Sequence, residues 1–515
     1  MGTRNQFADI ILVVVGVVLI RWAVSLNPYS GADVPPMYGD YEAQRHWMEI
    51  TTNLPIEQWY MNSTDNDLLY WGLDYPPITA YHSWLCGKVA DYINPDWVAL
   101  KSSRGYESSQ HKLFMRYTVL VVDLLLYIPA ILAFFLWTLK DQTDGEKLVC
   151  AAVALLYPGL ALIDHGHFQY NNASLGFALW AIVALATGHD LLGSIGFVLA
   201  LNYKQMELYH AMPFFCYLLG RCFYSKDENG FLKLIKIGVT VIIAFALCWL
   251  PFLSDIDLLV QVVHRLFPFD RGLFEDKVSN IWCSLEVLFK IRRILSQQSL
   301  VQLSLATTVG CLLPSSVELL LRPNVQKFKL ALVNSSLIFF LFSYQVHEKS
   351  ILIAALPVCL ILHQYSFGCT WFLLVSTFSM LPLLIKDGLI LPYAALCLLF
   401  YLAVNVSQSE WFTSKPNPSP HIVIQLLFWA SMCGATLLSA ASVTMTPPAR
   451  YPDLFPVLVS VYSCGHFVLF LIWFHYLQFT TPWSSEVKVQ QRKFEAHTGV
   501  KKARGRRSHI KWSKQ

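Results

Sequence analysis

Long apolar stretches recur along almost the whole of this chain, and they constrain its fold more than any other feature. A helix that crosses a bilayer needs about 20 mostly apolar residues. Charged residues make up only 14% of the 515 positions, whereas soluble domains carry roughly 25%. So little charge cannot cover the surface of a soluble protein of this size. The sequence therefore predicts an all-α polytopic membrane protein. The predicted spans, 14 in number, are residues 8–25, 117–138, 147–163, 173–187, 189–203, 207–221, 232–253, 299–320, 327–344, 350–364, 368–385, 388–405, 421–442 and 454–478.

Basic residues set the expected orientation of these spans. The segment 488–515 carries ten Lys and Arg residues against one acid, Glu495, and such a cluster beside a span stays in the cytosol. Residues 481–515 are thus expected to form a basic cytosolic tail behind a membrane domain, residues 1–480. An even number of spans places both termini in the cytosol. The long loops 26–116 and 254–298 then face the other compartment.

Most of the polar motifs fall on that far side of the membrane. The loops there contain GDYEAQRHWMEIT (39–51), LLYWGLDYPPITAYHSW (68–84), DHGHFQYNN (164–172) and QVHEKS (345–350). Polar side chains in so apolar a chain are costly unless they have a function. They indicate a single polar cavity that opens to the far compartment. Within the loop 254–298, we expect residues 281–298 to form an amphipathic helix lying on the membrane.

Three acids of the first loop are candidates for acid–base chemistry: Asp40, Glu42 and Asp74. Asp40 follows the first span by about fifteen residues, so its carboxylate can act as a general base beside lipid-borne substrates. The alternative is that Asp40 caps a helix, for which Asp is well suited. Glu42 would point to another side of that helix. Asp74 precedes the rigid Tyr75-Pro76-Pro77 and is either structural or orients a substrate.

Several cations and histidines are candidate ligands on the same side. Lys204, Arg265, His347 and Lys349 can hold a phosphate in a low-dielectric cavity, unless each simply pairs with a neighbouring acid. His165 and His167 form an H-x-H pair, which is a weak metal motif without further ligands. Hydrogen bonds from these histidines and Gln169 to substrate hydroxyls or phosphate are the favoured interpretation.

Two further expectations concern single residues. Arg21, near the far-side end of the first span, and Asp123, about two turns into the second, are predicted to form an ion pair, because lone charges at that depth are expensive. The sequon Asn62-Ser63-Thr64 lies in the first loop and is a candidate glycosylation site, whereas the sequon at Asn334 lies within a span and is expected to be silent.

Motifs for soluble donors and nucleotides are absent from the sequence. It contains no Walker A motif, dinucleotide fingerprint or Gly-x-Ser-x-Gly. We therefore expect no nucleotide-sugar donor and no nucleic-acid partner. A secondary transporter is a possible alternative, but transporters place ionisable groups near the membrane midplane and often consist of two repeated halves. In this sequence the ionisable residues lie mostly at one predicted membrane face, and no halves repeat.

Together, the motifs resemble those of a known enzyme family. GDYEAQRHWMEIT, LLYWGLDYPP, HGHFQYN, the KQM segment, RLFPFDRGLFEDKVSNIW and VHEKS are similar to motifs of the ER dolichyl-phosphate-glucose glucosyltransferases of N-glycan assembly. The resemblance covers the first ten predicted spans. It is strongest to the branch that adds the first glucose, in α-1,3 linkage, to the nine-mannose lipid-linked oligosaccharide. The branch that adds the second glucose, or a mannosyltransferase of the same fold, is the alternative.

The resemblance implies a GT-C fold and a mechanism that inverts the anomeric centre without metal or cofactor. It implies Asp40 as the base, dolichyl-phosphate-glucose as donor and a dolichyl-pyrophosphate-linked oligosaccharide as acceptor. Both lipids would be bound in the ER membrane, with the active site facing the lumen. The expected phosphate ligands are then Lys204, Arg265, His347 and Lys349. The expected substrate-binding residues are Glu42, Arg45, Asp74, Tyr75, His165, His167 and Gln169.

Overall fold

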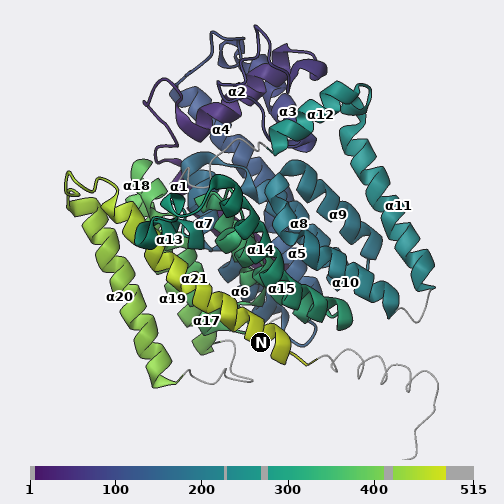
Figure 1. Cartoon of the computed structure of the whole chain (residues 1–515), viewed down its shortest axis with the longest axis vertical. Helices are drawn as coiled ribbons and strands as arrows, with labels where there is room; N and C mark the ends of the chain where they lie inside the picture. The colour runs from purple at the N-terminus through teal and green to yellow at the C-terminus, as the bar shows by residue number, and fades with distance from the viewer. Residues whose placement is uncertain (1–5, 225–228, 268–276, 411–420, 483–515) are drawn as a thin grey trace, which may run out of the picture.

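The computed structural model describes residues 6–224, 229–267, 277–410 and 421–482, and within these ranges every regular element is a helix. A bundle of long helices forms the body of the molecule, and a separate layer of shorter helices lies across one end of it (Figure 1). The basic segment 488–515 and residues 268–276 of the RLFPFDRGLFEDKVSNIW motif lie outside the described ranges.

Eight helices are long and apolar enough to cross a membrane, so the chain is a multi-pass membrane protein. They are Gln6–Ser25 (α1), Ser109–Thr138 (α4 and α5 joined), Gly230–Leu253 (α11 and η6), Gln297–Leu321 (α14), Val325–Phe342 (α15), Ile390–Ser407 (within α19), Ile422–Thr444 (α20) and Leu454–Thr480 (α21). A ninth candidate is a pair, α6 (Asp144–Leu155) and Pro158–Phe168 (α7 and η4), bent by 49°. The bend falls at Pro158, which cannot donate the backbone hydrogen bond that would continue α6.

The count of fourteen spans is not confirmed by these helices. The other five predicted spans coincide with shorter helices, α8 (Asn171–Ala186), α9 (Asp190–Tyr203), α10 (Ala211–Phe223), α16 (Ile351–Ile361) and α17 (Ser366–Phe378) with α18 (Leu381–Lys386). At 1.5 Å per residue, a helix of about 16 residues reaches only roughly 24 Å, short of a hydrocarbon core of about 30 Å. Every residue of α16 is buried, so its apolar sequence reflects protein packing rather than contact with lipid.

The prediction of one amphipathic helix over residues 281–298 is wrong. The structure has a short helix, α13 (Ile281–Phe289), then the 3₁₀ turn η7 (Ile291–Arg293), and α14 begins at Gln297. Lys290 separates the first two, because its φ of 51° lies in the left-handed region and cannot continue a right-handed helix.

The predicted ion pair between Arg21 and Asp123 is confirmed. The Arg21 Nε contacts Asp123 Oδ2, and the two side chains are 2% and 1% exposed. His165 Nε2 lies 3.1 Å from the same Asp123 oxygen, and Arg21 also donates to the Leu155 carbonyl at 3.1 Å. Asp123 opens a π-helical turn (η3, Asp123–Tyr127), an irregularity that often marks polar sites inside helices.

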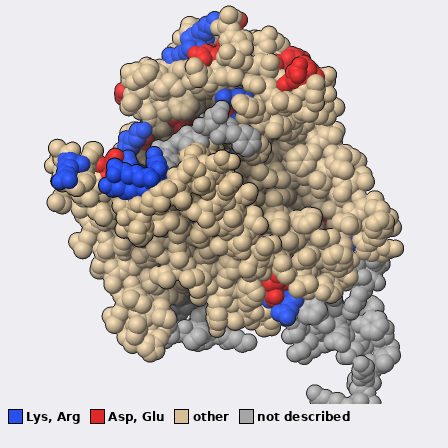
Figure 2. Space-filling view, viewed as in Figure 1, with Lys and Arg blue, Asp and Glu red and all other residues tan. Residues whose placement is uncertain are grey.

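The layer across the end of the bundle is formed by residues 26–108, which we call the head. It contains α2 (Gly39–Asn53) and α3 (Pro77–Ile93), and α12 (Ile256–Leu266) packs against it (Figure 1). A buried ion-pair network anchors α2: Arg45 donates to Glu42 at 2.6 and 2.7 Å and to Glu49 at 2.7 Å. On the face shown in Figure 2, most of the Lys, Arg, Asp and Glu side chains lie on or near the head, above a wide uncharged body.

Candidate active site

The backbone at the start of α2 presents the Asp40 carboxylate to the bundle. Tyr38 and Gly39 have φ values of 58° and 72°, and a Cβ on Gly39 would lie 2.7 Å from Ser30 Oγ, so only glycine suits this turn. The N-cap of α2 is Tyr38, and no side chain caps the helix. Asp40 therefore does not serve as the N-cap. Its backbone N–H donates to Ser30 Oγ at 3.2 Å, and its carboxylate points elsewhere.

Three donors from distant parts of the chain converge on Asp40 Oδ2. His167 Nε2 lies 3.0 Å away, and Gln169 Nε2 and Lys349 Nζ also donate to this oxygen. His167 belongs to the π-helical turn η4 (Leu162–Phe168) and Lys349 to the 3₁₀ turn η8 (Glu348–Ser350). The side chains of Asp40 and Lys349 are 22% and 19% exposed, whereas His167 is 1% exposed. The cluster thus has one open edge, and that edge is formed by Asp40 and Lys349.

Asp387 completes the cluster from behind, and sequence reasoning missed it. Its Oδ2 lies 2.5 Å from His167 Nδ1, and both side chains are 1% exposed. Asp387 occupies the short polar break between α18 and α19 (Ile390–Glu410). The available signal was a carboxylate next to a glycine, between two apolar stretches, where the predicted spans put it on the same side as Asp40.

A second lysine lies beside this cluster. Lys204 Nζ donates to Asn171 Oδ1 at 2.6 Å and lies 5.2 Å from the centre of the Tyr75 ring. It does not pair with Glu207, whose carboxylate contacts His210 at 2.9 Å instead. Burial, and next the charge of Lys349, lower the pKa of Lys204 to about 8. An anionic ligand beside Lys204 would stabilise its charged form.

The charges of the cluster stabilise one another. Burial alone would raise the pKa of Asp40, but the charges of Lys349 and His167 outweigh it and hold that pKa well below its usual value. Burial would likewise lower the pKa of Lys349, and the Asp40 carboxylate raises it instead. Asp40 is therefore an anion at neutral pH. Among the described residues, its second oxygen, Oδ1, has no hydrogen-bond partner.

Other residues singled out in the sequence have partners outside the Asp40 cluster. Arg265 donates to the backbone carbonyls of Leu73 (3.2 Å) and Gly72 (2.8 Å), so it supports the loop that carries Asp74 and Tyr75. Gln205 Nε2 also reaches this loop, donating to the Asp74 carbonyl at 3.0 Å. His347 precedes η8, next to the turn that contains Lys349.

Glu42, Arg45 and His165 are engaged in structural contacts. The first two form the buried network of α2, in which Tyr70 also donates to Glu42 Oε1 at 2.8 Å. His165 faces Asp123, in the opposite direction to His167, so the H-x-H pair does not converge on one point. No group of three or more His, Cys, Asp and Glu side chains in the described ranges is arranged to hold a metal ion.

The sequons at Asn62 and Asn334 differ in accessibility. Asn62 is exposed in the head, where its side chain accepts a hydrogen bond from the Leu68 N–H at 3.3 Å. Asn334 is fully buried in α15 and donates to Gln478 at 2.7 Å. Of these two asparagines, only Asn62 is exposed in the folded chain.

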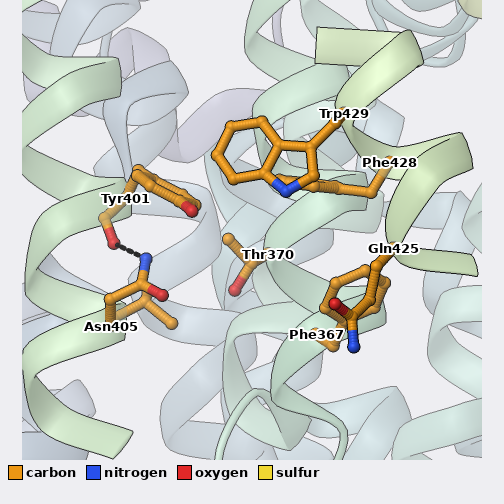
Figure 3. Close-up of a pocket in the computed structure, with 8 residues that line it drawn as sticks. Phe367, Thr370, Tyr401, Asn405, Gln425, Phe428 and Trp429 are labelled. Atoms are coloured by element: carbon orange, nitrogen blue, oxygen red, sulfur yellow. Dashed lines mark hydrogen bonds between the residues drawn. The ribbon is translucent and has the colours of Figure 1, made fainter. Parts of the chain in front are cut away.

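A separate cavity of about 230 Å³ lies between α17, α19 and α20 (Figure 3). Aromatic side chains, including Tyr401 and Trp429, line it together with Thr370 and Asn405. Asn405 is fifteen residues beyond the start of α19, or roughly 22 Å along the helix. The cavity is therefore remote from Asp387 and the Asp40 cluster, which lie at the other end of α19.

Comparisons with known proteins cover most of the chain. A model of the ALG6, ALG8 glycosyltransferase family matches residues 17–473. A Gallus gallus relative named "Dolichyl pyrophosphate Man9GlcNAc2 alpha-1,3-glucosyltransferase" is 55% identical over 498 residues, covering 92% of this chain and 96% of the relative. A Mus musculus relative of the same name is 52% identical over 500 residues, covering 92% and 97%. A Drosophila melanogaster relative, named as a probable enzyme of this kind, is 46% identical over 468 residues, covering 90% and 97%.

Proposed function

The chain belongs to the ALG6, ALG8 glycosyltransferase family, and on that premise we propose how it works as an α-1,3-glucosyltransferase. Its acceptor is the dolichyl-pyrophosphate-linked Man9GlcNAc2 oligosaccharide, the substrate in the names of relatives that are 52% to 55% identical. Its donor is dolichyl-phosphate-glucose. The absence of nucleotide-binding motifs supports a lipid-phosphate donor over a nucleotide sugar.

The observation that carries the mechanism is the position of the Asp40 carboxylate. It contacts His167 and Lys349 but remains about one-fifth exposed at the open edge of the site. A hydroxyl of the acceptor attacks C1 of the donor glucose, and its proton passes to Asp40 Oδ1. The bond between C1 and the phosphate oxygen breaks as the new glycosidic bond forms, and dolichyl phosphate leaves with the electron pair. Because the donor already has a phosphate leaving group, the reaction needs no general acid. A single displacement of this kind inverts the anomeric centre.

The donor phosphate binds on the lysine side of Asp40. Lys204 is the preferred ligand, because it is partly buried and its ammonium donates to the neutral Asn171 amide rather than to an acid. Lys349 adds a second positive charge while it remains paired with Asp40. His347 lies next to Lys349 in sequence, and Arg265 supports the loop opposite. His347 and Arg265 assist phosphate binding, with smaller contributions than Lys204 and Lys349.

Substrate contacts are expected from the loop that carries Asp74 and Tyr75. Tyr75 lies over Lys204, so its ring can pack on a sugar beside the phosphate. Gln169 donates to Asp40 and orients it. Glu42 and Arg45 then contribute by stabilising α2, which carries Asp40. His165 contributes by holding the η4 turn through its contact with Asp123. Asn62 carries a glycan if the head is luminal.

The membrane architecture proposed with this function is of the GT-C type with fourteen transmembrane helices. Its support is that each of the fourteen apolar stretches coincides with a helix or helix pair. The membrane domain comprises residues 1–480 and the cytosolic tail residues 481–515. The enzyme resides in the ER membrane with the Asp40 cluster facing the lumen and both termini in the cytosol.

The test is Asp40→Asn in the full-length protein in lipid nanodiscs, supplied with both lipid substrates. We expect transfer to fall by about 100- to 10,000-fold, with binding of both lipids retained. Asp91→Asn makes the same chemical change on the exposed surface of α3 and should leave transfer unchanged. A loss of less than about tenfold for Asp40→Asn would exclude Asp40 as the base. Transfer only to an acceptor that already carries one glucose would assign the chain to the second-glucose branch.

A further inference from the structure

His167 lies between two carboxylates. Its Nε2 is 3.0 Å from Asp40 Oδ2, and its Nδ1 is 2.5 Å from Asp387 Oδ2. The imidazole and Asp387 are almost fully buried, whereas Asp40 reaches the open edge of the site. The three side chains come from α2, η4 and the break after α18, so only the packed bundle brings them together.

The hydrogen-bonding capacity of imidazole determines what this arrangement requires. A carboxylate oxygen is an acceptor, so a ring nitrogen at hydrogen-bond distance from it must carry a hydrogen. Neutral histidine has one N–H, and the imidazolium has two. Both contacts of His167 are satisfied only by the imidazolium. With His167 and Lys349 cationic and Asp40 and Asp387 anionic, the charges of these four side chains sum to zero, which a site largely shielded from water favours.

We propose that Asp387 is a positioning residue that holds His167 as an imidazolium, with its Nε2–H directed at Asp40. The base is thereby kept ionised and oriented until the acceptor hydroxyl arrives. This inference deepens the proposed function, because it rests on Asp40 as the general base. It assigns a role to a residue that contacts no substrate.

Other charges around the cluster set how much His167 contributes. Lys349 Nζ donates to Asp40 and also lies 3.2 Å from His167 Nε2. Lys204 and Glu348 add charges beside Lys349. On the other side, Arg116 of α4 interacts with the charge of Asp387 and donates to the Gly166 carbonyl at 2.8 Å. Lys349 therefore still stabilises Asp40 when Asp387 is neutralised, so the loss of Asp387 weakens the base without abolishing it.

The test measures kcat/KM for the acceptor against pH with Asp387→Asn in the full-length protein. Asparagine keeps the shape but removes the charge that holds His167 as a cation. We expect a loss of about 10- to 100-fold at neutral pH, smaller than that for Asp40→Asn. We also expect the acid limb of the pH profile, where the rate falls as Asp40 becomes protonated, to move to higher pH. The shift should be about one unit or more, the usual effect of losing a nearby charge. Asp387→Glu should retain most of the activity that Asp387→Asn loses. Lys386→Gln, a substitution at an exposed neighbour, should change neither the rate nor the pH profile.

A purely structural role for Asp387 would lower activity without moving the acid limb. An acid limb that stays in place or moves to lower pH in Asp387→Asn would mean that Nε2 is bare and would overturn the inference. His167→Gln gives a second measurement in case Asp387→Asn does not fold. It should shift the acid limb in the same direction, and Asp387→Glu should have no further effect in that background. An additional effect of Asp387→Glu there would also overturn it.

The outcomes separate this inference from the proposed function. If Asp40→Asn keeps its activity, the assignment of the base is wrong. If Asp40→Asn is inactive while Asp387→Asn matches the unsubstituted protein in rate and pH profile, only the role of Asp387 is wrong.

Discussion

Lys349 forms an ion pair with Asp40 although 309 positions separate them in the chain. The pair joins η8 to the start of α2 and thereby closes the head onto the bundle. Both side chains are about one-fifth exposed, so the contact lies at the edge of the site rather than deep within it. The same contact supplies charge to the candidate base and holds it in place.

We expect donor use to depend on the charge of Lys204. Its pKa of about 8 lies below that of an ordinary lysine, so Lys204 is charged at neutral pH and loses its proton as the pH rises through 8. The value of kcat/KM for dolichyl-phosphate-glucose should fall over the same range. Lys204→Arg should remove this alkaline limb, because arginine stays charged, and Lys204→Gln should raise KM for the donor at all pH values. Lys88→Gln, on the exposed surface of α3, is the control.

Lys349→Met should destabilise the protein in a pH-dependent way. Because the folded-state pKa of Asp40 is depressed, its stabilising contribution is present above its unfolded pKa of about 3.9 and is lost as the pH falls through the folded pKa. The variant removes one of the two cations that face this carboxylate, while His167 still contacts it. Because the contact is about one-fifth exposed, we expect a cost of about 1–3 kcal/mol at neutral pH, less than for a fully buried pair. Thermal unfolding in detergent should show a constant difference from the unsubstituted protein at neutral pH that shrinks as the pH falls below about 4. A difference independent of pH would mean that Lys349 acts through packing alone.

Breaking the Arg21–Asp123 pair should also destabilise the fold. Both side chains are buried, and removal of one partner of a buried pair costs about 3–5 kcal/mol because the other charge is left uncompensated. Arg21→Met should therefore lower the midpoint of thermal unfolding, and Arg21→Met with Asp123→Leu should recover part of the loss. If the double variant is as unstable as the sum of the two single variants, the charges do not stabilise each other.

The proposed topology predicts that the two ends of the Ser109–Thr138 helix lie on opposite sides of the membrane. Asn62, in the head, and Lys140, just beyond the helix, are both exposed. In a Cys433→Ser background, which removes an exposed thiol, Asn62→Cys should react with an impermeant reagent only from the luminal side. Lys140→Cys should react only from the cytosolic side. Labelling of both from one side would contradict the predicted orientation.

The sequence alone predicted the membrane character of the chain and several of its local features. Apolar stretches are a property of short segments, so they could be recognised without knowledge of packing. The Arg21–Asp123 pair could also be predicted, because two opposite charges at similar depth in neighbouring spans have few alternatives to pairing. Asp40 was singled out by its place after the first span, with the family resemblance favouring it over Glu42 and Asp74.

Only the tertiary structure decided how the polar residues are partnered. Lys349 had an acid beside it in sequence, Glu348, yet it contacts Asp40 across the bundle. Asp387 lies beside Lys386 in sequence, yet it contacts His167, because α18 ends next to the η4 turn. The lengths of the short helices were likewise decided by packing, since a helix buried by protein needs an apolar sequence but not a bilayer's length. The amino-acid composition of a segment indicates whether it is buried. Which polar side chains contact one another depends on which segments the fold brings together.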